Sequence, residues 1–481
     1  MLTKPQPFNR QSHFITLLSL VVLLSIYLGK IFTFNFTIQI SKVWTVTLFT
    51  GAFLIYKSKH KSGRLLTLLI CTGLIFISSS NFQNSLKTYD QLFGRQLSLI
   101  AIVQDDAAYN QYGDYEFNIT KVKFIEDQQY LPGRIRIRTK QNIAVYRGDS
   151  IFVEGKLKPA LGSRTGSISY ANIEVLDSSP STLEKVRLKF FASVYSSLPE
   201  PHASLGIGFL AGVRSSITKD FQDQLSRVGL THIIAVSGYN LTILVLAVSK
   251  LGKKLSKYQR ALISLSLIFT FLLITGFSPS VVRAAVVCII SISCSFVGRK
   301  ISPLNLILIS AAITSIFNPT YLLEDIGWWL SFLAFFGVLI LAPAITDQIY
   351  RNKDKRPGLI ISMIIESVCA QIMTAPLIAH VFGTFSVISI LANILVVSWI
   401  PFIMLLVLIV GVIGMYDFEQ LRFIALLPKV ILTPIIIVIE RLSSLSWASI
   451  QLKFSQLGMV VCYLLIGVLI RLLNKKIVRR E

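Results

Sequence analysis

The sequence contains few acidic residues, few histidines and few cysteines. Its 24 Asp and Glu stand against 47 Lys and Arg, so the formal net charge is +23. The five cysteines all lie in apolar runs, without the paired spacing of a disulfide framework or a zinc site. The histidines are widely scattered, at His13, His60, His202, His232 and His380. A two-metal hydrolytic site needs clustered His and Asp ligands, so these positions predict no metal centre and no cofactor.

Hydrophobic residues make up 53% of the 481 residues, which is more apolar surface than one soluble core could bury. Many of the apolar runs reach the ~18 residues that suggest a membrane span. The sequence therefore predicts a mainly α-helical polytopic membrane protein with about 12 transmembrane helices, some broken or re-entrant. The runs lie near residues 13–31, 43–56, 65–79, 230–249, 261–277, 280–297, 303–318, 326–345, 358–381, 385–413, 424–440 and 455–472.

Basic residues between these runs predict the orientation of the chain. Lys57, Lys59, Lys61 and Arg64 separate the second and third runs with no acidic residue among them. Because cytoplasmic loops are rich in Lys and Arg, this loop and the N-terminus are predicted to be cytoplasmic. Alternate counting places the basic C-terminal tail inside as well, and the segment after the third run outside. This bias accounts for part of the net charge, so basicity alone does not indicate a nucleic-acid partner.

Shifts in composition divide the chain into four predicted regions. Residues 1–82 form a three-span membrane region that retains its first span, because no convincing signal-cleavage site follows it. Residues 83–180 form a small extracytoplasmic all-β domain. Residues 181–229 form amphipathic helices that lie in the membrane interface. Residues 230–481 form a polytopic membrane domain.

Short alternating segments separated by turn residues predict five strands in the β-domain. Five strands of this spacing indicate a small barrel of OB type. The segments are LSLIAIV, YEFNITKVKFI, GRIRIRT, DSIFVEGKL and SISYANIEVL, between residues 97 and 176.

The third strand predicts a basic ladder, because Arg134, Arg136, Arg138 and Lys140 alternate with apolar residues. Tyr112 and Tyr115 lie nearby and, with Tyr109 and Phe117, offer aromatic platforms beside the positive charge. Cations combined with aromatic rings are typical of proteins that bind single-stranded nucleic acid. The alternative is that the arginines only solvate the outer face of a strand.

The stretch GLTHIIAVSGYNL, residues 229–241, opens an apolar run yet carries several polar side chains. At 100° per residue, His232, Ser237 and Asn240 can share one side of a helix, and Gly238 is a position where that helix can bend. Polar groups at membrane depth are costly unless they face a cavity or a partner, so this side is a candidate functional wall. The alternative is that the serine bonds only its own backbone or a neighbouring helix.

Other polar side chains within apolar runs are also candidates for a channel lining. They are Arg283, Glu366, Gln371 and Asn393. An ionisable group inside a span is a functional hypothesis by default. A structural pair between Arg283 and Glu366, or hydrogen bonds between helices, is the competing interpretation.

Several of these segments resemble the ComEC family of competence DNA-uptake channels. The most specific combination is HIIAVSG in 210–244, TGFSPSVVRAAVV at 275–287 and WLSFLAFFGVLILAP at 329–343. Segments at 298–323 and 370–397 extend the resemblance to roughly 183–450. Asn240 stands where the family commonly has a histidine, and Gly327-Trp328-Trp329 stands where it has a Gly-Phe-Gln-type stretch.

The resemblance implies a channel domain over 230–481 that passes single-stranded DNA across the cytoplasmic membrane during natural competence. It also implies competence-machinery partners: a DNA receptor, a cytoplasmic motor and a separate nuclease. Many members continue into a metallo-β-lactamase-like nuclease domain, which this sequence is not expected to provide. The sequence has no GxxxxGK[ST] loop, so a transport protein driven by a partner or a gradient is expected, with no catalytic residues of its own.

Two other classes of protein remain open from the residues alone. One is a transporter or channel for a different anionic solute, which the same polar lining could serve. The other is an intramembrane serine hydrolase that uses Ser237 with His232 or His380 as its base. The five-residue spacing of Ser237 and His232 is angularly poor in an uninterrupted helix, which disfavours the hydrolase.

Overall fold

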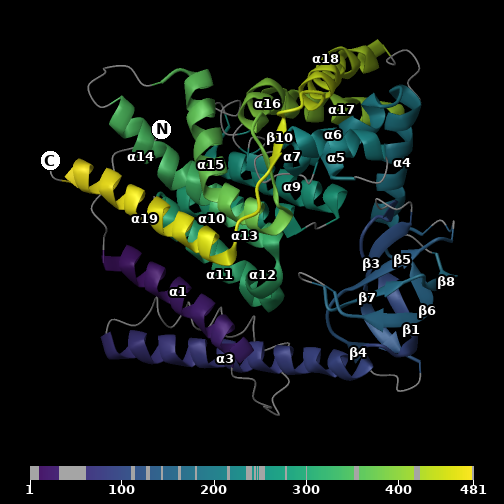
Figure 1. Ribbon diagram of the computed structural model, residues 1–481, viewed down its shortest axis with the longest axis horizontal. Coiled ribbons are helices and arrows are strands. Elements are labelled where there is room, and N and C mark those ends of the chain that lie inside the picture. Colours follow the sequence, from purple (N-terminus) through teal and green to yellow (C-terminus); the bar gives the residue numbers. More distant parts are fainter. Residues whose placement is uncertain are drawn as a thin grey trace. The chain divides into compact units, whose positions relative to one another are not determined.

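The computed structural model describes most of the chain, and the elements named below follow Figure 1. Two compact units are present, one of residues 1–180 with 305–328 and one of residues 181–304 with 329–481. The described residues are 10–31, 61–109, 114–125, 130–141, 143, 145–160, 164–178, 181–213, 217–234, 241, 242, 245, 248, 255–276, 279–299, 301–350, 357–416 and 423–478.

The first unit contains a pair of long helices, α1 (Arg10–Ile31) and α3 (Lys61–Leu92). They approach closely because Gly29 of α1 faces Ser79, whose Cβ would lie 2.8 Å from an added Cβ. The Ser79 hydroxyl donates to the Ile26 carbonyl oxygen at 3.1 Å. Small residues at such a contact let helix backbones come together in a membrane. The helix α3 is longer than the predicted span at 65–79, since it continues to Leu92.

A five-stranded barrel follows α3, which confirms the predicted OB-like domain. Its strands are β1 (Gln96–Val103), β3 (Tyr115–Phe124), β5 (Ile135–Thr139), β6 (Ser150–Lys158) and β7 (Gly166–Ser169). They pair in the order β1-β3-β5-β7-β6, and β1 also pairs with β6, which closes the barrel. The β5–β7 pair is parallel and the others are antiparallel, as in the OB topology.

Three further strands extend the barrel. The strands β2 (Ala108–Tyr109) and β4 (Tyr130–Leu131) pair with β3, and β8 (Asn172–Asp177) pairs with β6. The fifth predicted strand is therefore two strands, because the chain turns at Tyr170 with a φ of +58°. Apolar and polar residues alternate on both sides of this turn, so the sequence pattern did not indicate that the segment forms two strands.

Apolar side chains from alternate positions fill the barrel. Fully buried examples are Leu99, Ile119, Ile137, Ile151 and Ile168. Tyr89 from the last turns of α3 also enters this core, and its hydroxyl donates to the Pro132 carbonyl oxygen at 2.9 Å. Burial raises the pKa of Tyr89 to about 12, so its phenol stays neutral at physiological pH.

The second unit begins with helices α4 (Thr182–Ser197), α5 (His202–Ala211), α6 (Lys219–Arg227) and α7 (Thr231–Ile234). Residues 203–211 of α5 are all buried, so this helix belongs to the helical core. In contrast, α6 is amphipathic and buries only Phe221 and Leu225.

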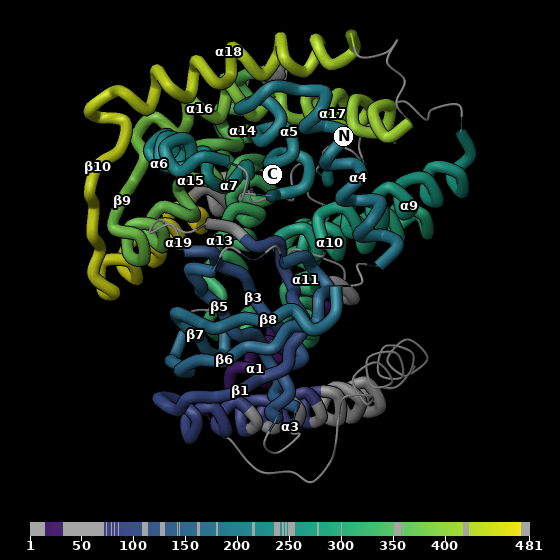
Figure 2. The backbone as a smooth tube through the Cα atoms, turned by 90° about the vertical axis from the view of Figure 1, so that its right-hand side faces the viewer, coloured from purple at the N-terminus to yellow at the C-terminus, as the bar shows by residue number. Residues whose placement is uncertain are grey.

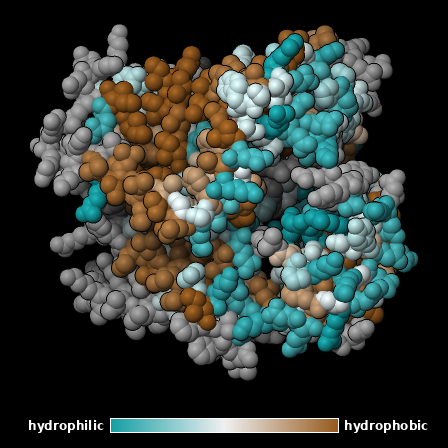
Figure 3. Space-filling view, in the orientation of Figure 1, coloured by the Kyte–Doolittle hydropathy of each residue, from teal (hydrophilic) through white to brown (hydrophobic). Residues whose placement is uncertain are grey.

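The remaining helices of this unit are apolar and range from 8 to 24 residues in length. They are α9 (Lys257–Thr275), α10 (Pro279–Phe296), α13 (Ile326–Phe336), α14 (Ala342–Ile349), α15 (Leu359–Phe382), α16 (Ser389–Val396), α17 (Ile400–Gly414), α18 (Leu426–Ser443) and α19 (Gln456–Val478). Hydrophobic residues gather over the helices in Figure 3, whereas hydrophilic residues cover much of the β-strands.

Six helical stretches of the described residues are long and apolar enough to cross a membrane. They are 257–275, 279–296, 326–349, 360–382, 389–414 and 423–443. Helices in 15–31, 202–211, 303–317 and 456–472 are apolar but shorter. The structure therefore supports several spans, while the predicted number of 12 is not confirmed. The run at 43–56 lies outside the described residues, and the run at 230–249 is described only in part.

Two of the six stretches change from α-helix to another helical form in their interior. A π-helical turn, η2 (Gly337–Leu341), joins α13 to α14, and a 3-10 turn, η3 (Val397–Trp399), joins α16 to α17. Short strands β9 (Thr384–Ser386) and β10 (Ser449–Gln451) pair antiparallel beyond the end of α15, and Figure 2 shows them side by side.

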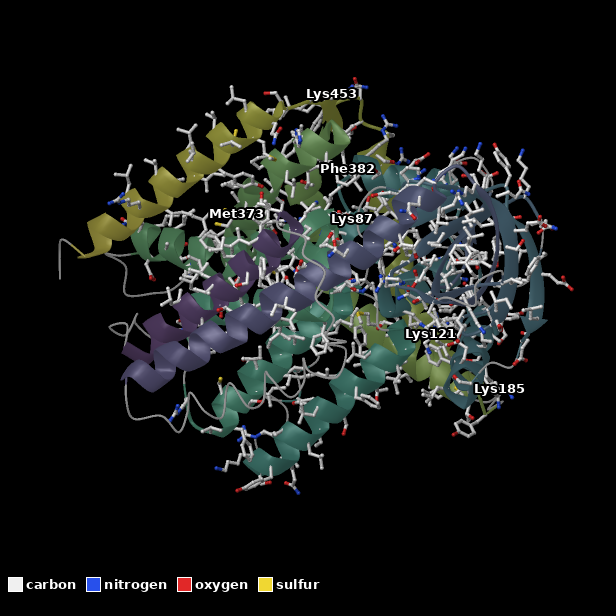
Figure 4. The ribbon with its side chains drawn as sticks, turned by 90° about the horizontal axis from the view of Figure 1, so that it is seen from below. Lys87, Lys121, Lys185, Met373, Phe382 and Lys453 are labelled. Carbon is white, nitrogen blue, oxygen red and sulfur yellow. The ribbon has the colours of Figure 1, made fainter. Side chains whose placement is uncertain are left out.

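The segment between β10 and α19 also packs on the end of α15. Figure 4 shows Phe382 and Lys453 beside each other, with Met373 further along α15. The Leu452 amide donates to the Gly383 carbonyl oxygen at 3.0 Å, and the Tyr463 hydroxyl of α19 donates to the Met373 carbonyl oxygen at 3.1 Å. These bonds hold α19 along α15.

We expect Gly411→Ala to destabilise the helical unit, because its backbone touches α4 directly. An added Cβ would lie 2.1 Å from Phe190 Cε2, and the Ser193 hydroxyl donates to the Gly411 carbonyl oxygen at 2.6 Å. Overpacking of this kind typically costs ~1–3 kcal/mol. The thermal unfolding midpoint of the detergent-solubilised protein should fall by several degrees. Gly467→Ala on α19 is the matched control, since nothing lies within 4 Å of its added Cβ; equal midpoints for both variants would contradict the α4–α17 contact.

Candidate functional site

The predicted basic ladder is present on the outer face of the barrel. Along β5, Ile135 and Ile137 are buried while Arg136 and Arg138 point outward. Glu116 of β3 lies opposite Arg138 and forms ion pairs with both arginines: Arg138 Nε donates to Oε2 at 3.0 Å, and Arg136 Nε lies 3.2 Å from Oε1. One carboxylate therefore bridges two guanidinium groups, which the alternation of β5 alone did not predict.

The two ends of the ladder contact aromatic rings. Arg134 Nη2 donates to the Tyr321 hydroxyl at 3.1 Å, and its guanidinium lies 5.9 Å from that ring centroid. Tyr321 belongs to α12 (Pro319–Glu324), a short helix of the same unit. At the other end, Lys140 Nζ lies 5.5 Å from the centroid of the Tyr170 ring. The four cations of the ladder outnumber its single bridging carboxylate, so this face keeps a positive charge.

Arg164, in the connection from β6 to β7, adds a fifth cation to this face. Its Nε donates to Asn118 Oδ1 at 3.0 Å, and Asn118 Nδ2 donates to Asp105 Oδ2 at 2.6 Å. Burial lowers the pKa of Arg164, while the charges of Glu116 and Asp105 act in the opposite direction. The pKa of a guanidinium lies so far above 7 that Arg164 keeps its proton. The sequence signal was its place in the loop between the fourth and fifth barrel strands, which often binds ligands in OB folds.

The aromatic platforms differ from those that the sequence suggested. Phe117 is only 2% exposed and belongs to the barrel core. Tyr115 is half-buried and packs edge-on against Phe117, with ring centroids 6.1 Å apart. Tyr112 lies outside the described residues. The strongly exposed rings of the described strands and turns are instead those of Tyr130 and Tyr170.

In the helical unit, His232 is the second residue of α7, directly after the corner at Gly229 that follows α6. Its ring Nδ1 is 3.0 Å from the Gly229 carbonyl oxygen. Gly229 adopts a φ of +75°, and an added Cβ would lie 2.6 Å from Ser389 Cβ and 3.0 Å from Ser386 Cβ. Only glycine suits both the left-handed backbone and this close approach. The corner that carries His232 is thus packed directly on the start of α16.

Gln371 of α15 reaches the same corner. Its Nε2 donates to the Ser386 carbonyl oxygen at 3.2 Å, and the Ser389 hydroxyl donates to the same oxygen at 3.1 Å. Gln371 and the Gly229 corner therefore both lie against Ser386. Asn393 lies one turn beyond Ser389 on α16, so it shares that face of the helix.

Two buried oxygen atoms near this corner have no hydrogen-bond donor. They are Oε1 of Gln371 and Oδ1 of Asn393. Buried acceptors are nearly always satisfied by protein or by ordered water, so an unsatisfied one needs an explanation. Acceptors of this kind are suited to a wall that faces water or a polar solute.

The π-helical turn η2 packs against α15 next to Gln371. An added Cβ on Gly337 would lie 2.6 Å from the Cys369 carbonyl oxygen and 2.9 Å from the Ala370 Cα. Isolated π-helical turns inside α-helices are frequent at functional sites. Helix composition alone did not reveal this break.

The other predicted lining residues are distributed as follows. Arg283 is 4% exposed on α10, and Glu366 is exposed on α15. In the described part of the chain, no ion pair joins these two side chains. Ser237, Gly238 and Asn240 lie outside the described residues. The candidate base His380 lies in the last turn of α15, where its Nδ1 is 2.9 Å from the Phe454 carbonyl oxygen.

A buried ion pair that was not predicted holds the end of α9. Arg187 Nη1 donates to Glu184 Oε1 at 2.6 Å, and both side chains are buried. Arg187 Nε also donates to the Ile274 carbonyl oxygen at 2.9 Å, and its guanidinium lies 4.5 Å from the Phe191 ring centroid. The i,i+3 spacing of opposite charges on an amphipathic helix was the available signal. This pair fixes α4 to the turn that leads into α10.

Comparison with known proteins bears out the resemblance seen in the helical segments. A family model described as Competence protein matches residues 209–476, which is more than half of the chain. ComE operon protein 3 of Bacillus subtilis (strain 168) is 28% identical over 204 residues. That match covers 42% of this chain and 25% of the relative, so it spans about a quarter of the relative's length. No solved structure matches the chain. Because the family match contains the His232 corner, α10, the π-helical turn and α15 to α18, we conclude that this chain belongs to the Competence protein family.

Proposed function

We propose that this chain passes single-stranded DNA across the cytoplasmic membrane during natural competence. The observation that carries the proposal is the row of cations on the outer face of β3 and β5. In OB folds this face and its adjoining loops bind oligonucleotides. The family match and the relative from the ComE operon support the same role.

The first step is capture of the strand on the barrel. Arg134, Arg136, Arg138, Lys140 and Arg164 offer contacts to successive phosphates, and Glu116 already occupies two of them. A phosphate that replaces this carboxylate makes similar charge-assisted bonds to the same guanidinium groups. With about four phosphate contacts, affinity for a single strand should fall roughly 50-fold between 50 and 200 mM salt.

The second step is passage through the helical unit. A single strand carries one negative charge per nucleotide, so its path must be polar and accessible to water. We assign the path to the side of the His232 corner that carries Gln371 and Asn393, together with Ser237, Gly238 and Asn240. Arg283 supplies positive potential near this path, and Glu366 lies on the same helix as Gln371.

The family match and the relative from the ComE operon support partners in the competence machinery. We assign the driving force to a cytoplasmic motor or a gradient, and degradation of the discarded strand to a nuclease partner. A DNA receptor delivers the substrate to the barrel outside the membrane. Both termini lie in the cytoplasm in this arrangement, because the basic loops face inside.

We expect the double variant Arg136→Ala/Arg138→Ala to weaken binding of a 20-nucleotide single strand by at least tenfold at 50 mM salt. Loss of two phosphate contacts should reduce the slope of log affinity against log salt by about 1.4. Fluorescence anisotropy on the full chain in lipid nanodiscs measures both. The double variant Lys185→Ala/Lys189→Ala on α4 removes the same charge outside the barrel and should bind like the wild type. Unchanged binding by the ladder variant would favour a different anionic solute.

We expect Glu116→Gln to tighten single-strand binding by about 3- to 10-fold, because both arginines become available to phosphate. Stability should change little, since the cost of removing charges from water offsets much of the attraction in partly buried ion pairs. Glu174→Gln on β8 makes the same change of charge on an exposed residue elsewhere in the domain. Equal affinities for the two variants would show that Glu116 does not compete with phosphate.

We expect Asn393→Leu to lower uptake of labelled DNA into the cytoplasm while leaving DNA at the cell surface unchanged. Its buried Oδ1 has no donor in the described structure, so its removal should not destabilise the protein. Uptake and surface binding are measured on the same cells, and the unfolding midpoint is measured on purified protein. A structural role would lower the midpoint instead, and normal uptake would remove Asn393 from the path.

A further inference from the structure

Tyr170 occupies an unusual corner between β7 and β8. Its side chain is 73% exposed, and its backbone adopts a φ of +58°, in the left-handed region that large side chains rarely adopt. The corner is held on its C-terminal side, because the Ala171 amide donates to the Arg138 carbonyl oxygen at 2.9 Å. Gln141 Nε2 also donates to Asn172 Oδ1 at 2.6 Å. A strained backbone that is held this firmly is often found at functional sites.

This corner places the Tyr170 ring at the end of the basic ladder. The strand β7 runs parallel to β5, with Ser167 beside Arg136 and Ser169 beside Arg138. These serines are small, and the side chains of Arg136 and Arg138 keep 20% and 32% of their area exposed. Beyond Ser169, the ring meets Lys140, whose Nζ lies 5.5 Å from the ring centroid. A row of cations thus ends on an open aromatic face.

We propose that Tyr170 is a stacking platform for an unpaired nucleobase, with Lys140 and Arg138 contacting the flanking phosphates. The inference rests on the proposed function and assigns one subsite within it. An aromatic ring beside a positive track is the arrangement that single-stranded nucleic acids require, because every base has a face to stack. A base inside a duplex has both faces covered by its neighbours, so this platform selects a single strand.

Tyr130 provides an internal control within the same domain. It is 68% exposed and lies 5.8 Å from Lys123 Nζ, so it matches Tyr170 in exposure and in its lysine partner. However, β4 pairs with β3 at Lys123, seven residues along the strand from Glu116. At ~3.3 Å per residue this is about 20 Å from the bridging carboxylate of the ladder. Among the described residues, Tyr130 has no row of cations beside it, so we expect that a bound base does not stack on its ring.

The test compares two probes on the full chain in lipid nanodiscs: a 20-nucleotide oligothymidylate and an abasic oligonucleotide of the same length. The measured quantity is the ratio of the two dissociation constants, which reports stacking separately from phosphate contacts. We expect Tyr170→Asn to reduce this preference for bases by about 5- to 150-fold, equivalent to ~1–3 kcal/mol for one stacked base. Asparagine tolerates the left-handed backbone, so this variant removes the ring and keeps the corner. Tyr170→Phe and Tyr130→Ala should both keep the wild-type ratio.

The outcomes separate this inference from the proposed function. If Tyr170→Asn keeps the wild-type ratio while Arg136→Ala/Arg138→Ala still weakens binding, Tyr170 is not a platform and the proposed function stands. If the wild-type protein binds neither probe in a salt-dependent way, both are overturned. If Tyr130→Ala lowers the ratio as much as Tyr170→Asn, the ladder does not define the subsite and the assignment fails.

Discussion

The need to satisfy buried polar groups governs this structure, because most of the chain is apolar helix. Where a helix ends, a nearby side chain donates a hydrogen bond to a backbone carbonyl oxygen that has no partner within the helix. Ser389 and Gln371 both donate to the Ser386 carbonyl oxygen between α15 and α16. Arg187 does the same for the Ile274 carbonyl oxygen at the end of α9, and its own charge is balanced by Glu184. Exceptions to this pattern occur at several places in the described residues, and two of them, Gln371 Oε1 and Asn393 Oδ1, lie on α15 and α16.

Charge follows a related constraint on the barrel. A row of outward arginines on one strand repels itself unless an acid or a bound anion lies between them. Glu116 provides that acid in the structure, and it does so from the neighbouring strand β3. The same position suits a phosphate in both charge and geometry. In the proposed function the bound strand must also be released, and a carboxylate that competes with phosphate favours that release.

The sequence predicted the β-domain more accurately than the helical unit. Alternation at period two places every residue of β5 on one face or the other, so Ile135, Ile137 and the two arginines were assigned correctly. Pairing partners are not encoded in alternation, so Glu116 and Arg164 were not recognised as parts of the ladder. The aromatic residues near in sequence were a poor guide, because Phe117 turns into the core while Tyr170 is brought in from a distant strand.

By itself, the sequence determined the class of protein, the all-β insertion and the residues that alternate or recur at helical spacing, since these depend on composition and local period. Tertiary structure decided which of them meet. The approach of Gly229 to Ser386 and Ser389, the π-helical turn against Cys369 and Ala370, and the Tyr170 corner beside Lys140 all join residues far apart in the chain. Contacts of this kind depend on how helices and strands pack in three dimensions, and no local pattern of residue types specifies that packing.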